Sequence, residues 1–179
     1  MQRVMIVGQP GAGKSTIARQ IGEITGLPVV HIDQIHWQPG WVERDRAEKT
    51  RLCQEVHARD QWIFEGGHSA TWAERLERAD TFIWIDLPLG LRYRRVFWRM
   101  LRHWGQSRPD LPEDCPEQFS FEFYRWIWDT RHSGRRGVQR CLDKADEGTR
   151  SYHLQSPAAV AQFLEHLAAE HGTEVPARR

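Results

Sequence analysis

Short apolar runs alternate along the chain with longer segments whose apolar residues recur at helical spacing. The apolar runs are Val4–Val7, Val29–Ile32, Trp62–Phe64, Thr81–Ile85 and Tyr152–Leu154. Runs this short and this apolar are typical of strands covered on both faces. The segments between them have the three-to-four-residue period of helices. The pattern therefore predicts an α/β fold in three layers, a five-stranded parallel sheet flanked by helices.

The same spacing sets the limits of the expected helices. Ile17, Ala18, Ile21 and Ile24 line one face of a helix that starts near Gly13, and the sequence Gly-Leu-Pro at 26–28 ends it. Ser156 and Pro157 fit the N-cap and first position of the last helix. The remaining helices are expected over about 45–59, 89–104, 117–132 and 136–146.

Two stretches predict loops, and one aromatic face predicts core. Residues 37–41 (WQPGW) and 105–118 are rich in proline, glycine or polar residues, and the second stretch has the composition of a mobile loop. Phe119, Phe123 and Trp126 fall on one helical face, which we interpret as core.

Composition limits the class of protein. The chain has 179 residues, of which 40% are hydrophobic and 27% charged, which suits one globular domain. No stretch has the apolar length of a signal peptide or of a membrane span. Cys53, Cys115 and Cys141 are widely separated and fit neither a disulfide framework nor a metal site. We therefore expect a cytoplasmic protein with no membrane partner, either a monomer or a homodimer.

Residues 8–15 carry the most specific motif. The segment reads GQPGAGKS and matches G-x-x-x-x-G-K-[ST] in full, with a strand before it and an amphipathic helix after it. Its glycines let backbone N–H groups point at phosphate oxygens, Lys14 neutralises the β- and γ-phosphates, and the Ser15 hydroxyl ligates Mg²⁺. We predict that ATP and Mg²⁺ bind this P-loop, although the motif does not separate ATP from GTP. The predicted nucleotide-binding residues are Gly8, Gly11, Ala12, Gly13, Lys14, Ser15 and Thr16.

Two acids and two arginines are candidates for the chemistry. Asp33 and Glu65 each follow an apolar strand, and ligands of open α/β sheets gather at those strand ends. A carboxylate there holds Mg²⁺ or accepts a proton from a hydroxyl, although turn-forming acids are common at strand ends as well. Arg95 and Arg99 share one helical face and would stabilise a transferring phosphoryl group if a lid delivered them; the alternative is a solvated basic face. The sequence does not decide whether Asp33 or Glu65 is the principal acid. We interpret His31, His36 and His68 as incidental.

Several segments taken together resemble one family. They are the P-loop, HID at 31–33 with WQPGW at 37–41, DLP at 86–88, RPD at 108–110, CPE at 115–117 and FYRWIW at 123–128. These segments resemble the adenylate-kinase-related proteins often labelled DNA topology modulation (FlaR-type) proteins, over roughly residues 1–165. The resemblance implies a nucleoside-monophosphate-kinase-like P-loop fold, with strand order 2-3-1-4-5 and a lid after strand 4. Arg95 and Arg99 match the spacing of its lid arginines, and Asp33 matches the acid that closes strand 2.

The chain departs from that family after the third strand. Relatives tend to carry Asp-Gly-Asn-Tyr there, where this chain has EGGH at 65–68, and the AMP-site motifs of adenylate kinase are not recognisable. The acceptor of the phosphoryl group therefore stays open. We expect it between the 33–72 region and the lid, in contact with Asp33, Trp37, Trp41, Gly66 and Arg108.

These observations predict one P-loop kinase-like domain over residues 1–171, with a lid and insertion at about 92–146 and a flexible tail at 172–179. The expected function is transfer of the γ-phosphoryl group of Mg-ATP to a small acceptor, for which a nucleotide is one candidate. A kinase of the shikimate or gluconate type would share every motif used here. An ATP-binding regulator of DNA topology is the third hypothesis, and a net charge of +1 argues against strong DNA binding.

Overall fold

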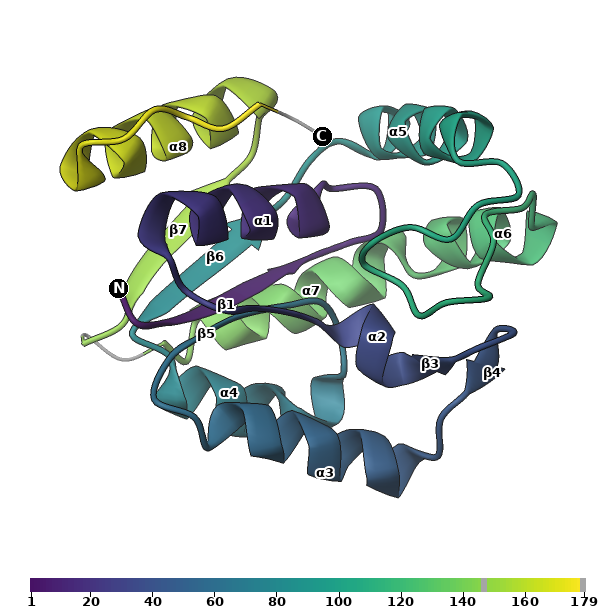
Figure 1. Cartoon of the computed structure of the whole chain (residues 1–179), viewed down its shortest axis with the longest axis horizontal. Coiled ribbons are helices and arrows are strands. Elements are labelled where there is room, and N and C mark those ends of the chain that lie inside the picture. The colour runs from purple at the N-terminus through teal and green to yellow at the C-terminus, as the bar shows by residue number, and fades with distance from the viewer. Residues whose placement is uncertain (146–147, 178–179) are drawn as a thin grey trace.

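Five parallel strands form the central sheet (Figure 1). In the computed structural model, which describes residues 1–145 and 148–177, the strands of this sheet are β1 (Arg3–Gly8), β2 (Val29–His31), β5 (Trp62–Glu65), β6 (Thr81–Ile85) and β7 (Arg150–Leu154). Their order is β2-β5-β1-β6-β7, and every neighbouring pair is parallel. Counted along the sheet strands alone, this is the order 2-3-1-4-5, so the predicted fold class is confirmed.

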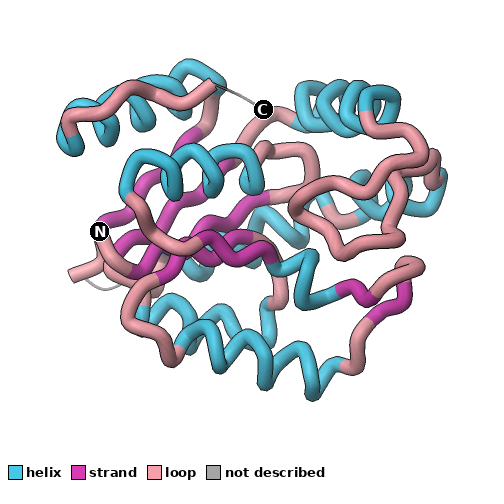
Figure 2. The backbone as a smooth tube through the Cα atoms, viewed as in Figure 1, coloured by secondary structure: helices cyan, strands magenta, loops and turns pink. Residues whose placement is uncertain are grey.

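Helices cover both faces of the sheet. Helices α1 (Lys14–Thr25) and α8 (Pro157–His171) lie on one face, while α3 (Arg46–His57), α4 (Trp72–Arg78) and α7 (Arg131–Leu142) lie on the other (Figures 1 and 2). Side chains of β1 alternate between the two layers, because successive strand residues point to opposite faces. Ile6 packs in the core beneath α1 and α8, whereas Met5 and Val7 pack in the core above α3, α4 and α7.

The remaining elements gather at the carboxyl ends of the strands (Figure 1). Helix α2 (Ile32–His36) follows β2 and leads into a hairpin of β3 (Trp37–Gln38) and β4 (Val42–Glu43). The 3₁₀-helix η1 (Ser69–Thr71) precedes α4. Helix α5 (Leu89–Arg102) follows β6, and α6 (Phe121–Asp129) precedes α7. This end of the sheet is where open α/β folds bind their ligands.

Several predicted boundaries differ from the structure. The second strand ends at His31, and Asp33 lies in the first turn of α2 rather than closing the strand. The stretch 37–41 is a β-hairpin rather than a loop, with Gly40 and Trp41 in left-handed conformations at its turn. The region expected to hold helices at 117–132 and 136–146 instead has α6 and α7 joined at Thr130.

The aromatic face around residues 119–126 is not core, so that prediction was wrong. Phe119 and Trp126 are 56% and 50% exposed, and Ile127 is the buried residue of α6. Phe119 lies before Ser120, the N-cap of α6, so the helical spacing that predicted this face does not apply to it. In the part of the chain described, no helix has both the length and the apolar character of a membrane span. Residues 146–147 and 178–179, which belong to the predicted insertion and tail, lie outside the described residues.

Candidate active site

The P-loop has backbone conformations and close contacts that favour glycine. Gly8, Gly11 and Gly13 have φ values of 150°, 77° and 96°, a range that side chains rarely adopt. A Cβ atom on Gly8 would lie 2.5 Å from the Ile85 carbonyl oxygen, and one on Gly11 would lie 2.5 Å from that of Arg92. The loop therefore fits against β6 and α5 because these positions lack side chains. Helix α1 begins directly after it, at Lys14.

Helix α5 contacts the P-loop through two arginines. The Arg95 guanidinium donates to the Ala12 carbonyl at 3.0 Å, and buried Arg92 donates to the Leu87 carbonyl at 3.2 Å and to that of Pro10 at 3.4 Å. These bonds bring basic side chains next to the loop predicted to bind phosphate. Arg95 is thus positioned beside the P-loop by the helix that packs on it.

Glu65 joins two strand ends to the P-loop. Its carboxylate accepts a hydrogen bond from the Ser15 hydroxyl at 3.0 Å and lies 2.8 Å from Nδ1 of His31. Glu65 is 2% exposed at the end of β5, inside the sheet, and His31 is 6% exposed at the end of the neighbouring edge strand β2. Gly66 follows at φ 110°, and a Cβ there would overlap the Ile32 side chain. The acid and the predicted Mg²⁺-ligating hydroxyl are therefore in direct contact.

Asp33 has the electrostatic setting of a proton acceptor. Burial and the neighbouring Glu65 carboxylate raise its pKa from 3.8 to about 6, although Lys14 and Arg108 act in the opposite direction. The residue is half-buried and faces the same cleft as Lys14. A carboxylate with a pKa near 6 is ionised at neutral pH and is also a stronger base than an exposed aspartate.

A network of ion pairs lines the cleft opposite α2. The Glu117 carboxylate lies 3.0 Å from Nε of Arg99 and 2.5 Å from Nε of Arg108, and Arg108 also pairs with Asp110 at 2.5 Å. Burial and the nearby Arg108 lower the pKa of Arg99, whereas Arg108 lowers the pKa of Asp110 against the effect of burial. Arg99 and Arg108 were both predicted site residues, and the structure places them in one cluster with two acids that were not predicted.

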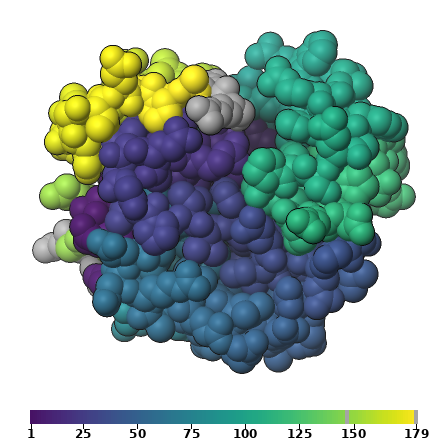
Figure 3. All heavy atoms as spheres, viewed as in Figure 1, coloured from purple at the N-terminus to yellow at the C-terminus, as the bar shows by residue number. Residues whose placement is uncertain are grey.

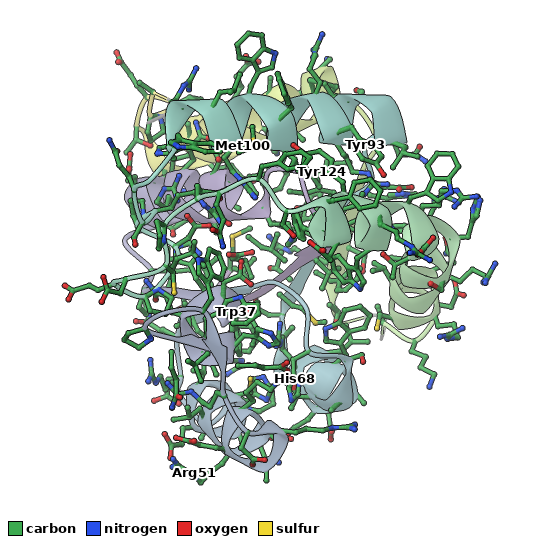
Figure 4. The ribbon with its side chains drawn as sticks, turned by 90° about the vertical axis from the view of Figure 1, so that its right-hand side faces the viewer. Trp37, Arg51, His68, Tyr93, Met100 and Tyr124 are labelled. Atoms are coloured by element: carbon green, nitrogen blue, oxygen red, sulfur yellow. The ribbon has the colours of Figure 1, made fainter. Side chains whose placement is uncertain are left out.

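The hairpin and the segment 105–118 hold each other in place. The Trp41 indole donates to the Pro116 carbonyl at 3.1 Å, and the Gly40 N–H donates to that of Asp114 at 2.9 Å. Trp37 and Trp41 form an edge-to-face pair with ring centroids 5.3 Å apart. Trp37 lies above α3, on the side of the molecule that Figure 4 faces. The stretch predicted as a mobile loop is thus tied to the hairpin by backbone and side-chain hydrogen bonds.

One cleft of about 1200 Å³ joins all of these groups. Figure 3 shows the purple N-terminal segment recessed between the yellow C-terminal helix and the teal segment that contains α5. Every residue predicted to act in binding or catalysis lines this cleft. They are Gly8, Gly11, Ala12, Gly13, Lys14, Ser15, Thr16, Asp33, Trp37, Trp41, Glu65, Gly66, Arg95, Arg99 and Arg108.

Sequence reasoning missed three residues of this region. His31, interpreted as incidental, contacts Glu65 directly. Asp110 and Glu117 were noticed only as parts of the segments RPD and CPE, and the structure places them on the arginines of the cleft wall. The arginine at 108 and the acids at 110 and 117 were the one sequence signal for this ion-pair cluster, but a surface loop would carry the same residues.

Comparison with known proteins supports a kinase fold. No family model matches the sequence. A cytidylate kinase from Pyrobaculum aerophilum is 28% identical over 138 residues, which cover 69% of this chain and 72% of that protein. A shikimate kinase structure from Acinetobacter baumannii superposes with a TM-score of 0.53 at 17% identity, covering 95% of this chain and 94% of that one. A shikimate kinase from Bacteroides thetaiotaomicron gives 0.51 at 15% identity, covering 94% and 97%. The chain therefore has the fold of P-loop kinases.

Proposed function

We propose that the chain is an ATP-dependent phosphotransferase that moves the γ-phosphoryl group of Mg-ATP to a hydroxyl group of a small, uncharged acceptor. The observation that carries this proposal is Asp33, a carboxylate with a raised pKa that lines the same cleft as the P-loop lysine. The kinase fold supports the reaction class, and the charges around Asp33 support the class of acceptor.

The residues divide into two groups with different roles. Lys14 and Arg95 neutralise the phosphate oxygens, while Asp33 accepts the proton of the attacking hydroxyl. The acceptor oxygen forms a bond to the γ-phosphorus, and the bond from that phosphorus to the bridging oxygen of ADP breaks. The electron pair of the broken bond stays on ADP, and the proton moves to the Asp33 carboxylate.

The chain offers donors that fit Mg²⁺. The Ser15 hydroxyl and the Glu65 carboxylate are hard oxygen donors 3.0 Å apart beside the P-loop. Among the described residues, no group of three or more histidine, cysteine or acidic side chains is placed to hold a metal by itself. This agrees with an ion that takes few protein ligands and completes its coordination with phosphate and water. When bound, Mg²⁺ would neutralise charge on the phosphates.

The charges of the acceptor wall argue against a phosphate-bearing acceptor. The wall carries four acids, Asp33, Glu65, Asp110 and Glu117, and two of the arginines that line it, Arg99 and Arg108, already pair with acids. A dianionic phosphate would approach several carboxylates in a cleft of low polarisability, where repulsion between like charges is strong. Hydroxyl groups, by contrast, donate hydrogen bonds to carboxylates without adding charge.

A nucleoside monophosphate is the second candidate acceptor. The 28% identity to a cytidylate kinase favours it, and Trp37 and Trp41 offer flat surfaces on which a base can stack. The ATP-binding regulator of DNA topology suggested by the FlaR-type resemblance is supported by that resemblance alone. It predicts tight nucleotide binding with little turnover.

A panel of acceptors separates these three hypotheses. Purified protein would be supplied with Mg-ATP or Mg-GTP and either uncharged polyhydroxylated molecules, hydroxy acids or nucleoside monophosphates, and release of the nucleoside diphosphate would be measured. The proposal predicts acceptor-dependent turnover with an uncharged hydroxylated compound, which Lys14→Ala abolishes. Turnover with nucleoside monophosphates alone would select the second candidate. ATP binding with no acceptor-dependent turnover, together with DNA binding that weakens steeply with salt, would select the regulator.

A further inference from the structure

One carboxylate oxygen in the acceptor wall is shared by two arginines. Oε1 of Glu117 lies 3.0 Å from Nε of Arg99 and 2.5 Å from Nε of Arg108. The Glu117 side chain is 7% exposed, and Arg108 and Arg99 are 10% and 29% exposed. Arg108 has a second partner in Asp110, at 2.5 Å. Two of the arginines that line the acceptor region, Arg99 and Arg108, are therefore neutralised from within the protein.

We propose that Glu117 determines acceptor specificity by occupying Arg99 and Arg108, so that acceptors carrying a phosphate group are excluded. This inference rests on the proposed phosphotransferase function, because it concerns the second substrate of the same cleft. A guanidinium group binds phosphate through two parallel hydrogen bonds. The Glu117 carboxylate competes with phosphate for those donors. Glu117 therefore both pairs with the two arginines and repels an incoming phosphate group.

The backbone fixes Glu117 in this position. Its N–H donates to the Gln106 carbonyl at 3.0 Å, and its own carbonyl accepts from the Gly105 N–H at 3.0 Å. The preceding residue is held as well, since the Pro116 carbonyl accepts the indole N–H of Trp41. A carboxylate delivered by such a framework does not leave the arginines at low energetic cost. It acts as a fixed part of the wall.

Electrostatics predict how the wall changes when the Glu117 charge is removed. Burial, and then the like charge of Arg108, lower the pKa of Arg99, while Glu117 acts in the opposite direction. Replacing the carboxylate with an amide of the same shape would leave two close cations with Asp110 as their nearest acidic partner. Partly buried cations that lack compensating charge favour an incoming anion. The wall would then present an arginine pair to phosphate.

The test measures binding of a phosphate-bearing acceptor by Glu117→Gln, with Glu113→Gln as the matched control. Glu113 is an exposed glutamate of the same segment that does not line the cleft. CMP would be titrated by calorimetry into each protein saturated with a non-hydrolysable Mg-ATP analogue, so that the P-loop is occupied. We expect Glu117→Gln to bind CMP at least tenfold more tightly than the wild type, and Glu113→Gln to match the wild type. The double variant Glu117→Gln with Arg99→Gln should lose the gain.

A second variant covers the case in which Glu117→Gln does not fold, which a thermal melt would reveal. Asp110→Asn removes one of the two acidic partners of Arg108 and leaves Arg99 paired. This variant should bind CMP about threefold more tightly than the wild type. Unchanged CMP affinity in whichever of these variants is folded would overturn the inference. Failure of the proposed function alone looks different, because it appears as no turnover with any acceptor while the binding comparison still reads out Glu117. Wild-type turnover of CMP would overturn both.

Discussion

The two halves of the cleft are built in different ways. The nucleotide half is one continuous segment, in which residues 8–16 supply the glycines, the lysine and the hydroxyl. The acceptor half is assembled from α2, the β3–β4 hairpin, the end of β5, α5 and the segment 105–118, which are distant in sequence. The first half carries Lys14 and no acid, whereas the second carries four acids together with arginines of α5 and Arg108. In the proposed function, the first half holds the phosphates and the charges of the second half select the acceptor.

Substitution of Lys14 should have the largest effect, and it should affect every acceptor equally. Lys14→Ala removes the charge that neutralises the transferring phosphates, so we expect kcat to fall on the order of a thousandfold. Lys144→Ala, which changes an exposed lysine outside the cleft, is the control. A loss confined to one acceptor would contradict the division of the cleft into two halves.

Substitution of Asp33 should affect transfer to a hydroxyl while leaving nucleotide binding in place. Asp33→Asn removes the proton acceptor, and kcat should fall about a hundredfold with little change in ATP affinity. In the wild type, kcat/KM for the acceptor should fall tenfold per pH unit below about pH 6, because protonated Asp33 accepts no proton. Asp60→Asn, at an exposed site, should behave as wild type. A flat profile from pH 5 to 8 would exclude Asp33 as the base.

The same substitution should stabilise the fold at neutral pH. The pKa of Asp33 is raised to about 6 in the folded chain from 3.8, so the folded state binds this proton more tightly and stability falls as pH rises from about 4 to 6. At pH 7.5 the ionised carboxylate destabilises the fold by about 3 kcal/mol, because each unit of pKa difference corresponds to about 1.4 kcal/mol. Asp33→Asn should therefore raise Tm by roughly 6–12 °C at pH 7.5 and by much less near pH 4. A lower Tm at pH 7.5 would mean that Asp33 contributes to stability instead.

Loss of an aromatic wall residue should have the smallest effect. Trp37→Ala removes a flat surface next to the acceptor, and we expect kcat/KM for the acceptor to fall about fivefold, since an aromatic contact contributes about 1 kcal/mol. Trp104→Ala is the matched control, because Trp104 is 58% exposed and does not line the cleft. Equal losses in both variants would indicate a general effect on folding rather than a contact with the acceptor.

The difference between the halves also explains what the sequence predicted. The P-loop was predicted in full because its chemistry depends on residues adjacent in the chain. The sheet was predicted because strands buried on both faces are continuous apolar runs, as in Thr81–Ile85. Asp33 and Glu65 were predicted because ligands of open α/β sheets bind at the carboxyl ends of the strands. That rule did not show that α2 begins before Asp33.

Predicting the acceptor wall required knowledge of contacts between residues far apart in the sequence, which no local pattern contains. Glu117 is functional in this account because the fold brings Arg99 to it from eighteen residues away along the chain, and Arg108 arrives through a turn of the same loop. The aromatics of α6 show the opposite failure. Phe119 and Trp126 have the helical spacing of core residues, but Phe119 lies before the start of α6, and the helix buries Ile127 and leaves Trp126 exposed. Tyr124 of the same helix does find a partner, stacking on Tyr93 of α5 with ring centroids 5.8 Å apart (Figure 4).

The chemical identity of the phosphorylated product tests the central claim most directly. Phosphorus NMR of a reaction containing Mg-ATP and an acceptor mixture of uncharged polyhydroxylated compounds and nucleoside monophosphates distinguishes a phosphate monoester from a new diphosphate. The acid-lined acceptor wall and Asp33 predict a monoester signal that grows with ADP and disappears in Asp33→Asn. Loss of the nucleoside monophosphate signal, with two nucleoside diphosphates formed for each ATP consumed, would contradict the account.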